Sequence, residues 1–587
     1  MANQNYKNWD KSDLVKEIDQ LRKRKKYGLV WEEKPEDVVE QCKKELPVLE
    51  EVKNREISTE PDKPTNLLIE GENYHALSVL NYTHKAKIDV IYIDPPYNLG
   101  NKDFIYNDQF VDKEDTYRHS KWISFMSKRL LLAKNLLTES GTIFVSIDDK
   151  EYPRLIMIME DIFREENLKT VCVKMSESTG VKMASVIKTG RIPKLKEYLV
   201  IAKKDGINNL YLERLPKELW DNEYKTIITN VTEQQVNKVR EIRDNEDRTI
   251  KEIQKCDGII RHWKYTSLSE YFKNNNIPKK EQSEFKYKNA WKIFRTVATT
   301  ENVKRLADKA RDSVSGTFFS VVTPQKKLYL ILKDYNKEQS QPRLKILLAD
   351  DYLTQHPGDF WFDIKTTGLD NEGGVPFKNG KKPLKLIERV IKTNKKNDII
   401  VLDFFAGSGT TAEAVLKLNK EDNGNRSFIL CTYNEENSTK VRIVDEYCYP
   451  RIKNAIKGFK GKDGYGGNLK YFKTAFVPAE PTDKNKSTLT KKATEMLCVK
   501  EDTFEQVKIN KRYSIFQNKK RYTGIIYDHL AIDDFKKSIA KFDGIFSVYV
   551  FSLADDSFDE EFEDIKGKVK LSPIPEAILR VYRRIFK

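Results

Sequence analysis

Cysteine and histidine are scarce in this sequence of 587 residues. The six cysteines are scattered without a C-x-x-C pair, and the six histidines show no H-x-x-x-H or mixed His/Cys spacing. Isolated cysteines of this kind are typical of reduced cytosolic thiols. The pattern argues against a disulfide-stapled domain and against a structural zinc site, so we expect no metal.

Long apolar runs are absent as well. No stretch approaches the roughly 20 apolar residues that a membrane-spanning helix needs. The opening MANQNYKNWDKSD has no apolar core of a secretory leader. These absences predict a cytoplasmic protein with no membrane association.

Acidic residues are outnumbered by basic ones. The chain has 105 lysines and arginines against 89 aspartates and glutamates, a formal net charge of +16. A basic surplus favours a polyanionic partner, most often nucleic acid. The length exceeds what one hydrophobic core supports, so the sequence predicts about two to four domains.

The order of segments predicts an α/β fold that an insertion interrupts. Apolar strands alternate with amphipathic helices from Asn66 to about residue 204, and again after about residue 366. This alternation is typical of βαβ units and of a parallel sheet covered on both faces. Between these stretches the chain is polar and rich in lysine. We expect an N-terminal helical arm, a first α/β half, an inserted domain, a second α/β half and a C-terminal α+β domain, at 1–60, 61–204, 205–365, 366–460 and 461–587.

The stretch IYIDPPYN, residues 91–98, ends a buried strand in a stiff turn. Pro95 cannot donate to a ladder hydrogen bond, and it restricts Asp94 to an extended conformation. The carboxyl edge of an open α/β sheet is where ligands bind. Asp94 is therefore a candidate functional side chain, although a solvated acid in a stiff turn gives the same tetrapeptide.

A glycine loop follows a second strand, in VLDFFAGSGTTAEAV at residues 401–415. No lysine follows Gly409, as a P-loop requires, and the third glycine of a dinucleotide fingerprint is missing. The loop suits a zwitterion such as the methionine end of S-adenosylmethionine. Asp403 accepts from the ammonium group while the loop amides and Thr410 hold the carboxylate. Glu435, after the next strand, is placed to accept from ribose hydroxyls.

Together, DPPY and DFFAGSG resemble the motifs of amino-group DNA methyltransferases, and their order resembles that of the β class. NLLIEGENYHAL, GTIFVSIDDKEYPRL and LSPIPEAILRVYRRIF are similar to segments of the modification subunit of Type III restriction–modification systems. The resemblance implies a Rossmann-like S-adenosylmethionine-dependent methyltransferase fold, interrupted by a target-recognition domain. It also implies a double-stranded DNA substrate, a homodimer, and a helicase–nuclease restriction subunit as partner.

The resemblance also implies roles for single residues. Asp94, with the carbonyl of Pro95, accepts the hydrogens of the amine of a flipped-out adenine, and Tyr97 stacks on the base. Pro95 and Pro96 hold these groups in place. The expected cofactor contacts are Glu72, Asp148, Lys382, Asp403, Phe405, Gly407, Gly409, Thr410 and Glu435. A solvated loop is an alternative for Asp148, and the start of a helix is an alternative for Lys382. The expected contacts to the target base are Asn98, Phe104, Tyr106 and Trp122, although Trp122 suits a helix core better.

Two positions depart from the usual pattern of the resembled family. Glu72 stands where Asp is commoner, and either Glu435 or Glu436 suits the ribose site. Cytosine-N4 methylation is an alternative, but members with that specificity more often carry Ser at position 94, so Asp94 favours adenine-N6. A catalytically inactive recognition subunit that guides a nuclease is a second alternative. The intact DPPY and FAGSG motifs argue against it.

Overall fold

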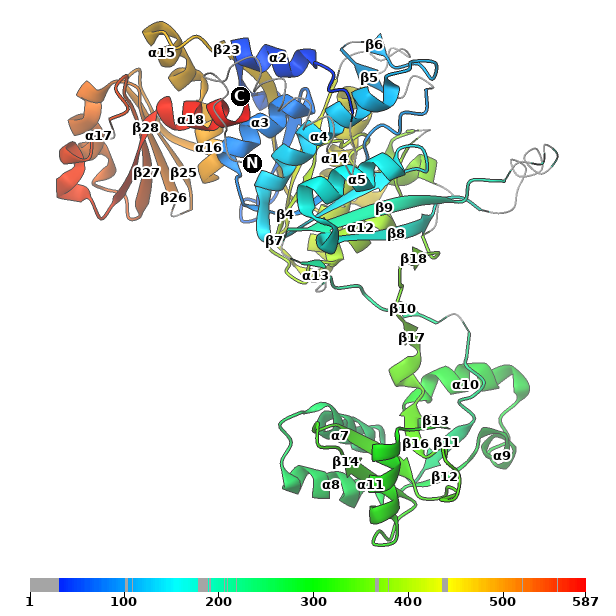
Figure 1. Ribbon diagram of the computed structural model, residues 1–587. Coiled ribbons are helices and arrows are strands. Elements are labelled where there is room, and N and C mark those ends of the chain that lie inside the picture. The colour runs from blue at the N-terminus through cyan, green and yellow to red at the C-terminus, as the bar shows by residue number, and fades with distance from the viewer. Residues whose placement is uncertain are drawn as a thin grey trace, which may run out of the picture. The chain divides into compact units, whose positions relative to one another are not determined.

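A computed structural model of the protein describes residues 31–100, 104–107, 109–177, 188, 190, 192–204, 206–207, 210–217, 219–364, 369–377, 380–434, 442–519, 521–556 and 558–586. The chain forms two compact units (Figure 1). The first combines the chain up to Leu212 with the chain from Gly358 onward, and the second is Glu213–Pro357.

The first unit is built on one large mixed sheet. Its strands follow the order β1-β23-β3-β20-β19-β4-β7-β9-β8-β18, and β2 also pairs with β23. Neighbours from β23 to β7 run parallel, whereas β1 and β9 run antiparallel to their neighbours. The bounds are β1 Glu45–Glu51, β2 Ile57–Ser58, β3 Thr65–Glu70, β4 Ile88–Ile93, β7 Leu137–Ile147, β8 Leu168–Lys174, β9 Lys196–Lys203, β18 Phe360–Trp361, β19 Ile400–Asp403, β20 Ser427–Thr432 and β23 Asn468–Pro478.

Side chains of the central strand β4 point alternately into two cores. Ile91 and Ile93 belong to one core, and Val90 and Tyr92 belong to the other. A parallel strand buried on both faces reads as a continuous apolar run, as IDVIYI does. Helices α3 (Asn73–Thr83), α4 (Arg118–Leu136) and α5 (Tyr152–Phe163) contribute to the first core. Helices α12 (Leu384–Lys392), α13 (Thr410–Asp422) and α14 (Tyr449–Lys457) contribute to the second.

The predicted α/β fold is confirmed, but the sheet is mixed and not purely parallel. The sequence predicted a parallel sheet, but β9 is antiparallel to both β7 and β8. Its first residues therefore lie at the edge where the parallel strands end. None of the helices in the described part of the chain is long and apolar enough to cross a membrane.

The predicted helical arm over residues 1–60 is wrong for its described part. Residues 31–60 contain only one α-helix, α2 (Asp37–Lys44), which leads into β1. Strand β1 pairs along its whole length with β23, and its residues Leu46, Val48 and Leu49 are buried. A partner strand more than 400 residues away in the sequence leaves no local signal.

The C-terminal region has the predicted α+β content but a different boundary. Strand β23 belongs to the large sheet, so the region begins after Pro478, not at residue 461. A five-stranded sheet follows. Its residues Phe516, Ile525 and Tyr549 pack into the first core of the α/β sheet. The elements are α15 Asp483–Lys492, α16 Thr494–Glu501, β24 Glu505–Ile509, β25 Tyr513–Asn518, β26 Arg521–Ile526, α17 Ile532–Ile539, β27 Ile545–Phe551, β28 Val569–Ile574 and α18 Glu576–Ile585.

The second unit holds a six-stranded antiparallel sheet with its own core around Trp263, Phe294 and Phe318. The polar, lysine-rich stretch thus folds into regular helices and strands, and the unit is shorter than the predicted 205–365 because β18 pairs with β8 in the first unit. The elements are β10 Leu215–Pro216, β11 Thr226–Thr229, α7 Glu233–Asp244, α8 Ile250–Ile260, β12 Lys264–Ser267, α9 Leu268–Asn274, α10 Gln282–Lys288, β13 Ile293–Val297, α11 Glu301–Arg311, β14 Phe318–Val322, β15 Leu328–Leu332, β16 Lys345–Leu348 and β17 Thr354–Gln355.

Candidate active site

The two sequence motifs meet at one cavity. Strands β4 and β19 are parallel neighbours, so the turn after Ile93 and the loop after Asp403 lie side by side at the carboxyl edge of the sheet. The cavity there has a volume of about 510 Å³. The predicted site residues that line it are Glu72, Asp94, Pro95, Pro96, Phe104, Tyr106, Lys382, Asp403, Phe405, Gly407 and Thr410.

Asp403 is held at the base of the glycine loop. Its Oδ1 accepts from the Phe405 N–H at 3.0 Å and its Oδ2 from the Thr411 hydroxyl at 2.6 Å. Burial raises the pKa of Asp403 to about 7; its two hydrogen bonds oppose this effect, and the Asp94 charge adds to it. Gly407, at φ 49°, would carry a Cβ no closer than 3.8 Å to any neighbour outside the adjacent residues. The loop therefore presents bare backbone to the cavity.

Asp94 belongs to a compact ionic network at the tip of β4. Its Oδ1 accepts from the Tyr97 hydroxyl at 2.8 Å and lies 3.2 Å from the Lys382 ammonium. Lys382 directly precedes Pro383, the N-cap of α12, and its Nζ also lies 2.6 Å from a carboxylate oxygen of Glu197. Burial raises the pKa of Asp94, Lys382 lowers it, and the Glu197 charge raises it further.

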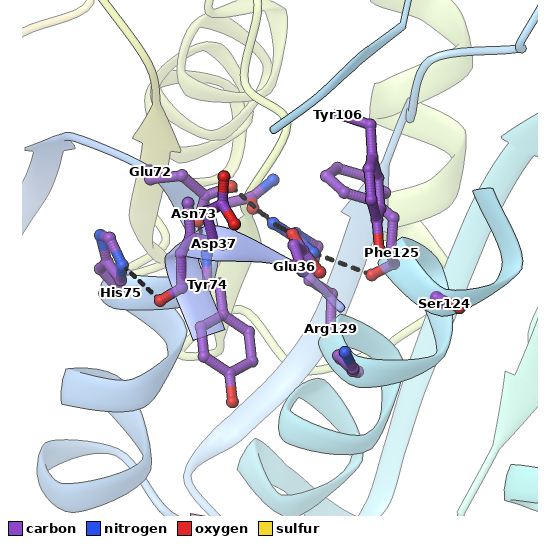
Figure 2. Close-up of polar contacts among 12 residues, drawn as sticks. Glu36, Asp37, Glu72, Asn73, Tyr74, His75, Tyr106, Ser124, Phe125 and Arg129 are labelled. Atoms are coloured by element: carbon purple, nitrogen blue, oxygen red, sulfur yellow. Dashed lines mark hydrogen bonds and ion pairs between the residues drawn. The ribbon is translucent and has the colours of Figure 1, made fainter. Parts of the chain in front are cut away.

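One wall of the cavity rests on a buried arginine, Arg129 of α4 (Figure 2). Its guanidinium lies 2.6 Å from a carboxylate oxygen of Glu72 and 2.7 Å from one of Glu36, and it donates to Asn73 Oδ1 at 2.5 Å. Asn73 in turn donates to the carbonyl of Phe404 at 3.2 Å. Burial alone would lower the pKa of Arg129, but the two carboxylates raise it. Glu72, predicted to contact the cofactor, is thus fixed between this arginine and the cavity.

Aromatic rings form the neighbouring wall. Phe104 packs edge-on against Phe125 with ring centroids 5.2 Å apart, and Phe125 lies 5.9 Å from Phe405. Tyr106, in the short strand β5 (Ile105–Tyr106), donates to the carbonyls of Lys34 at 2.7 Å and Pro35 at 3.0 Å. These contacts connect the loop after DPPY with the glycine loop and with the segment before α2.

A family model for DNA methylase matches residues 88–442, which is more than half of the chain. This chain belongs to the DNA methylase family. The match runs from β4 to the segment after β20, so it includes both motifs and the whole second unit.

Several other proteins resemble this DNA methylase in sequence. The "Probable type III restriction-modification enzyme HindVI Mod subunit" of Haemophilus influenzae is 27% identical over 85% of this chain and 65% of its own length. The StyLTI Mod subunit of Salmonella typhimurium, a type III restriction-modification enzyme, is 29% identical over 66% of this chain and 56% of its own length. The chain thus covers less than two thirds of either relative.

Among solved structures, the cytosine-N4-specific PvuII DNA methyltransferase is 10% identical, with a TM-score of 0.27 over 68% of this chain and 96% of that one. The M1.HpyAVI–SAM complex is 12% identical, with a TM-score of 0.27 over 66% of this chain and 97% of that one.

Several predicted site residues of the DNA methylase do not line the cavity. Asn98 donates to a carboxylate oxygen of Glu151 at 2.6 Å, and Trp122 is fully buried and donates to the Pro96 carbonyl at 2.7 Å. Asp148 accepts from Lys194 at 3.1 Å. Gly409, at φ 79°, is the N-cap of α13, and Tyr97 points its hydroxyl into the ionic network. Glu435 and Glu436 lie outside the described residues.

Sequence reasoning missed Glu151 of the DNA methylase, which accepts a hydrogen bond from Asn98, the residue after the DPPY turn. It is fully buried, and besides Asn98 its Oε1 contacts His119 Nδ1 at 2.6 Å. Burial raises the pKa of Glu151 to about 7, and burial lowers the pKa of His119 to about 4. The acid-rich stretch DDKE, just after a strand, was the available signal.

Sequence reasoning also missed Glu197 and Arg129. Glu197 stands at the start of a strand and not at its carboxyl end, and Arg129 is one basic residue among several in KRLLLAK.

Proposed function

We propose that the protein is a sequence-specific DNA methyltransferase that transfers a methyl group from S-adenosylmethionine to the N6 amine of adenine. One observation carries the proposal. The Asp94 turn and the glycine loop, which the sequence separates by about 300 residues, line the same cavity at adjacent strand ends. The Asp94 turn suits the target amine, which receives the methyl group, and the glycine loop suits a zwitterionic cofactor.

The residues at the loop fit S-adenosylmethionine. The Asp403 carboxylate would accept from the ammonium group, and the exposed backbone at Gly407 with the N-terminus of α13 would hold the carboxylate. The largely apolar wall of Phe404 and Phe405 suits the remainder. When bound, the cofactor supplies a methyl group on a positively charged sulfur.

The residues at the end of β4 suit the amine that receives the methyl group. An exocyclic amine is a poor nucleophile because its lone pair is delocalised into the ring. The Asp94 carboxylate and the Pro95 carbonyl would accept its two hydrogens and favour the tetrahedral nitrogen that attack requires. The target base must first leave the helical stack. Two prolines fix both acceptors, so their positions need not be ordered at each turnover.

The identity of the methylated base follows from Asp94 by family resemblance, since cytosine-N4 enzymes more often carry Ser there. The test is transfer of tritiated methyl groups to unmethylated DNA, followed by digestion and chromatography of the nucleosides. N6-methyladenine supports the proposal, and N4-methylcytosine supports the alternative. Absence of label in either base would leave a recognition subunit with an inactive site.

The relatives named as Mod subunits suggest the type of enzyme system to which the protein belongs. We propose that the protein is the modification subunit of a Type III restriction–modification system that acts on double-stranded DNA in the cytoplasm. By the same resemblance it acts as a homodimer and binds a helicase–nuclease restriction subunit. The second unit, Glu213–Pro357, is the target-recognition domain in this proposal, because a separately folded insertion leaves the α/β sheet intact.

A further inference from the structure

Glu197 reaches the DPPY turn because of the one strand reversal in this part of the sheet. Strand β9 pairs antiparallel with β7, so Tyr198 at the start of β9 lies opposite Ile147 at the end of β7. Glu197, adjacent to Tyr198, thereby joins the carboxyl edge of the parallel strands. Its side chain is 18% exposed.

The carboxylate of Glu197 binds two members of the catalytic turn network. Its Oε2 lies 2.6 Å from Lys382 Nζ and accepts from the Tyr97 hydroxyl at 3.0 Å. Lys382 also donates to the Tyr97 hydroxyl, at 2.6 Å. Tyr97 has a single phenolic hydrogen, which it divides between Asp94 and Glu197.

The distances show which acid holds the ammonium group. Lys382 Nζ is 2.6 Å from Glu197 and 3.2 Å from Asp94, and its side chain is only 8% exposed. Two carboxylates share one buried cation, so the pair with Glu197 leaves Asp94 incompletely neutralised. If Glu197 were absent, the ammonium would pair with Asp94 alone and compete with an incoming amine for its lone pairs.

We propose that Glu197 is a positioning residue for methyl transfer. It holds the Lys382 ammonium and the Tyr97 hydroxyl so that the Asp94 carboxylate remains available to the target amine. The inference rests on the proposed function and assigns a role to a residue outside both sequence motifs.

The proposal predicts a direction for the pH dependence. The groups that act on Asp94 are Lys382 just before α12, Glu197 from β9, Tyr97 and Tyr92 from its own turn and strand, and Asp403 from β19. A second cation, Lys194, lies 3.8 Å from Glu197 Oε1. The Glu197 charge raises the pKa of Asp94. Its removal in Glu197→Gln lowers that pKa, so the acid limb of the kcat/KM profile, which reports groups of the free enzyme, moves to lower pH.

The experiment measures tritiated methyl transfer to unmethylated DNA as a function of pH, together with calorimetric binding of S-adenosylmethionine. We expect Glu197→Gln to lower kcat by about tenfold to a hundredfold, the range for misplaced catalytic groups. Cofactor binding persists, and the acid limb shifts to lower pH. The matched control is Glu139→Gln, which removes an exposed carboxylate 2.8 Å from Lys204 and leaves kcat and the limb unchanged.

Failure of this inference is distinct from failure of the proposed function. A wild-type protein that transfers no methyl group to DNA contradicts the function before any variant is made. A folded Glu197→Gln variant with wild-type kcat and acid limb contradicts only the role of Glu197. A fall in kcat at every pH without a shift of the limb also contradicts it, because that is the result of a purely structural contact.

A double variant covers the case in which Glu197→Gln does not fold. Glu197→Gln with Lys382→Met removes both partners of the buried pair, which is milder than leaving one charge unpaired. Lys382 affects the pKa of Asp94 more than Glu197 does, so the acid limb of the residual activity should now move to higher pH. An acid limb that stays at the wild-type pH would overturn the proposal.

Discussion

Lowering the pH from 8 to 6 should weaken S-adenosylmethionine binding through a single side chain, Asp403. Burial holds its pKa at about 7, against an ordinary value of 3.8. Only the ionised form accepts fully from an ammonium group. An acid with this pKa is about 90% ionised at pH 8 and about 10% ionised at pH 6, so the apparent affinity falls about tenfold.

The raised pKa of Asp403 gives the stability of the free protein the opposite pH dependence: a rise in pH strengthens cofactor binding but lowers stability. Between about pH 4 and pH 7 the unfolded chain releases the Asp403 proton while the folded chain retains it. Stability therefore falls as the pH rises through this window, by an amount on the order of 4 kcal/mol at most. Asp403→Asn removes the buried charge, so it should raise the melting temperature at pH 8 while it weakens cofactor binding.

Calorimetric titration at pH 6, 7 and 8 measures both effects alongside thermal unfolding. Asp403→Asn should bind weakly at every pH and lose the tenfold dependence. Asp422→Asn is the matched control for the affinity measurement, since Asp422 ends the same helix, α13, and pairs with Arg426, four residues later, at 2.7 Å. Wild-type affinity that is constant from pH 6 to pH 8 would refute the reasoning, because the ammonium group would then have another acceptor.

The remaining predictions concern catalysis, the cofactor loop, the buried arginine and the inserted unit. Asp94→Ala should lower tritiated methyl transfer by on the order of a hundredfold or more while calorimetric cofactor binding survives; near-normal turnover would contradict the assignment. Gly407→Val should weaken cofactor binding at least about tenfold, or about 1.4 kcal/mol, because its φ of 49° and its place in the cavity disfavour a side chain; unchanged affinity in a folded variant would locate the cofactor elsewhere. Arg129→Met should lower the free energy of unfolding by about 3–5 kcal/mol in urea titration, because the buried Glu36 and the half-buried Glu72 lose their cation; a loss below about 1 kcal/mol, roughly that of a surface pair, would contradict this account. Exchange of residues 213–357 for the corresponding unit of a relative should transfer the methylated sequence; an active chimera that kept its original sequence would refute the assignment of recognition to this unit.

Local sequence was sufficient for the central strands and for the two motifs. A run such as IDVIYI is buried on both faces wherever it lies in a parallel sheet, and two prolines end the strand whatever surrounds it. The glycine loop is equally local, because Gly407 and Gly409 adopt positive φ values that other residues disfavour. These features predicted the α/β fold, the family and the cavity-lining residues Asp94 and Asp403 from the chain alone.

Only the tertiary structure decided which distant residues complete the site. Glu197 reaches Lys382 because β9 runs against its neighbours, and strand direction is a property of the sheet. Arg129 pairs with Glu36, about 90 residues away in the sequence, and β1 pairs with β23, more than 400 residues away. Asn98 does not line the cavity. It donates to Glu151, because a buried carboxyl group requires a hydrogen-bond donor. Periodicity and propensity describe one element at a time, whereas burial and charge pairing depend on which elements become neighbours.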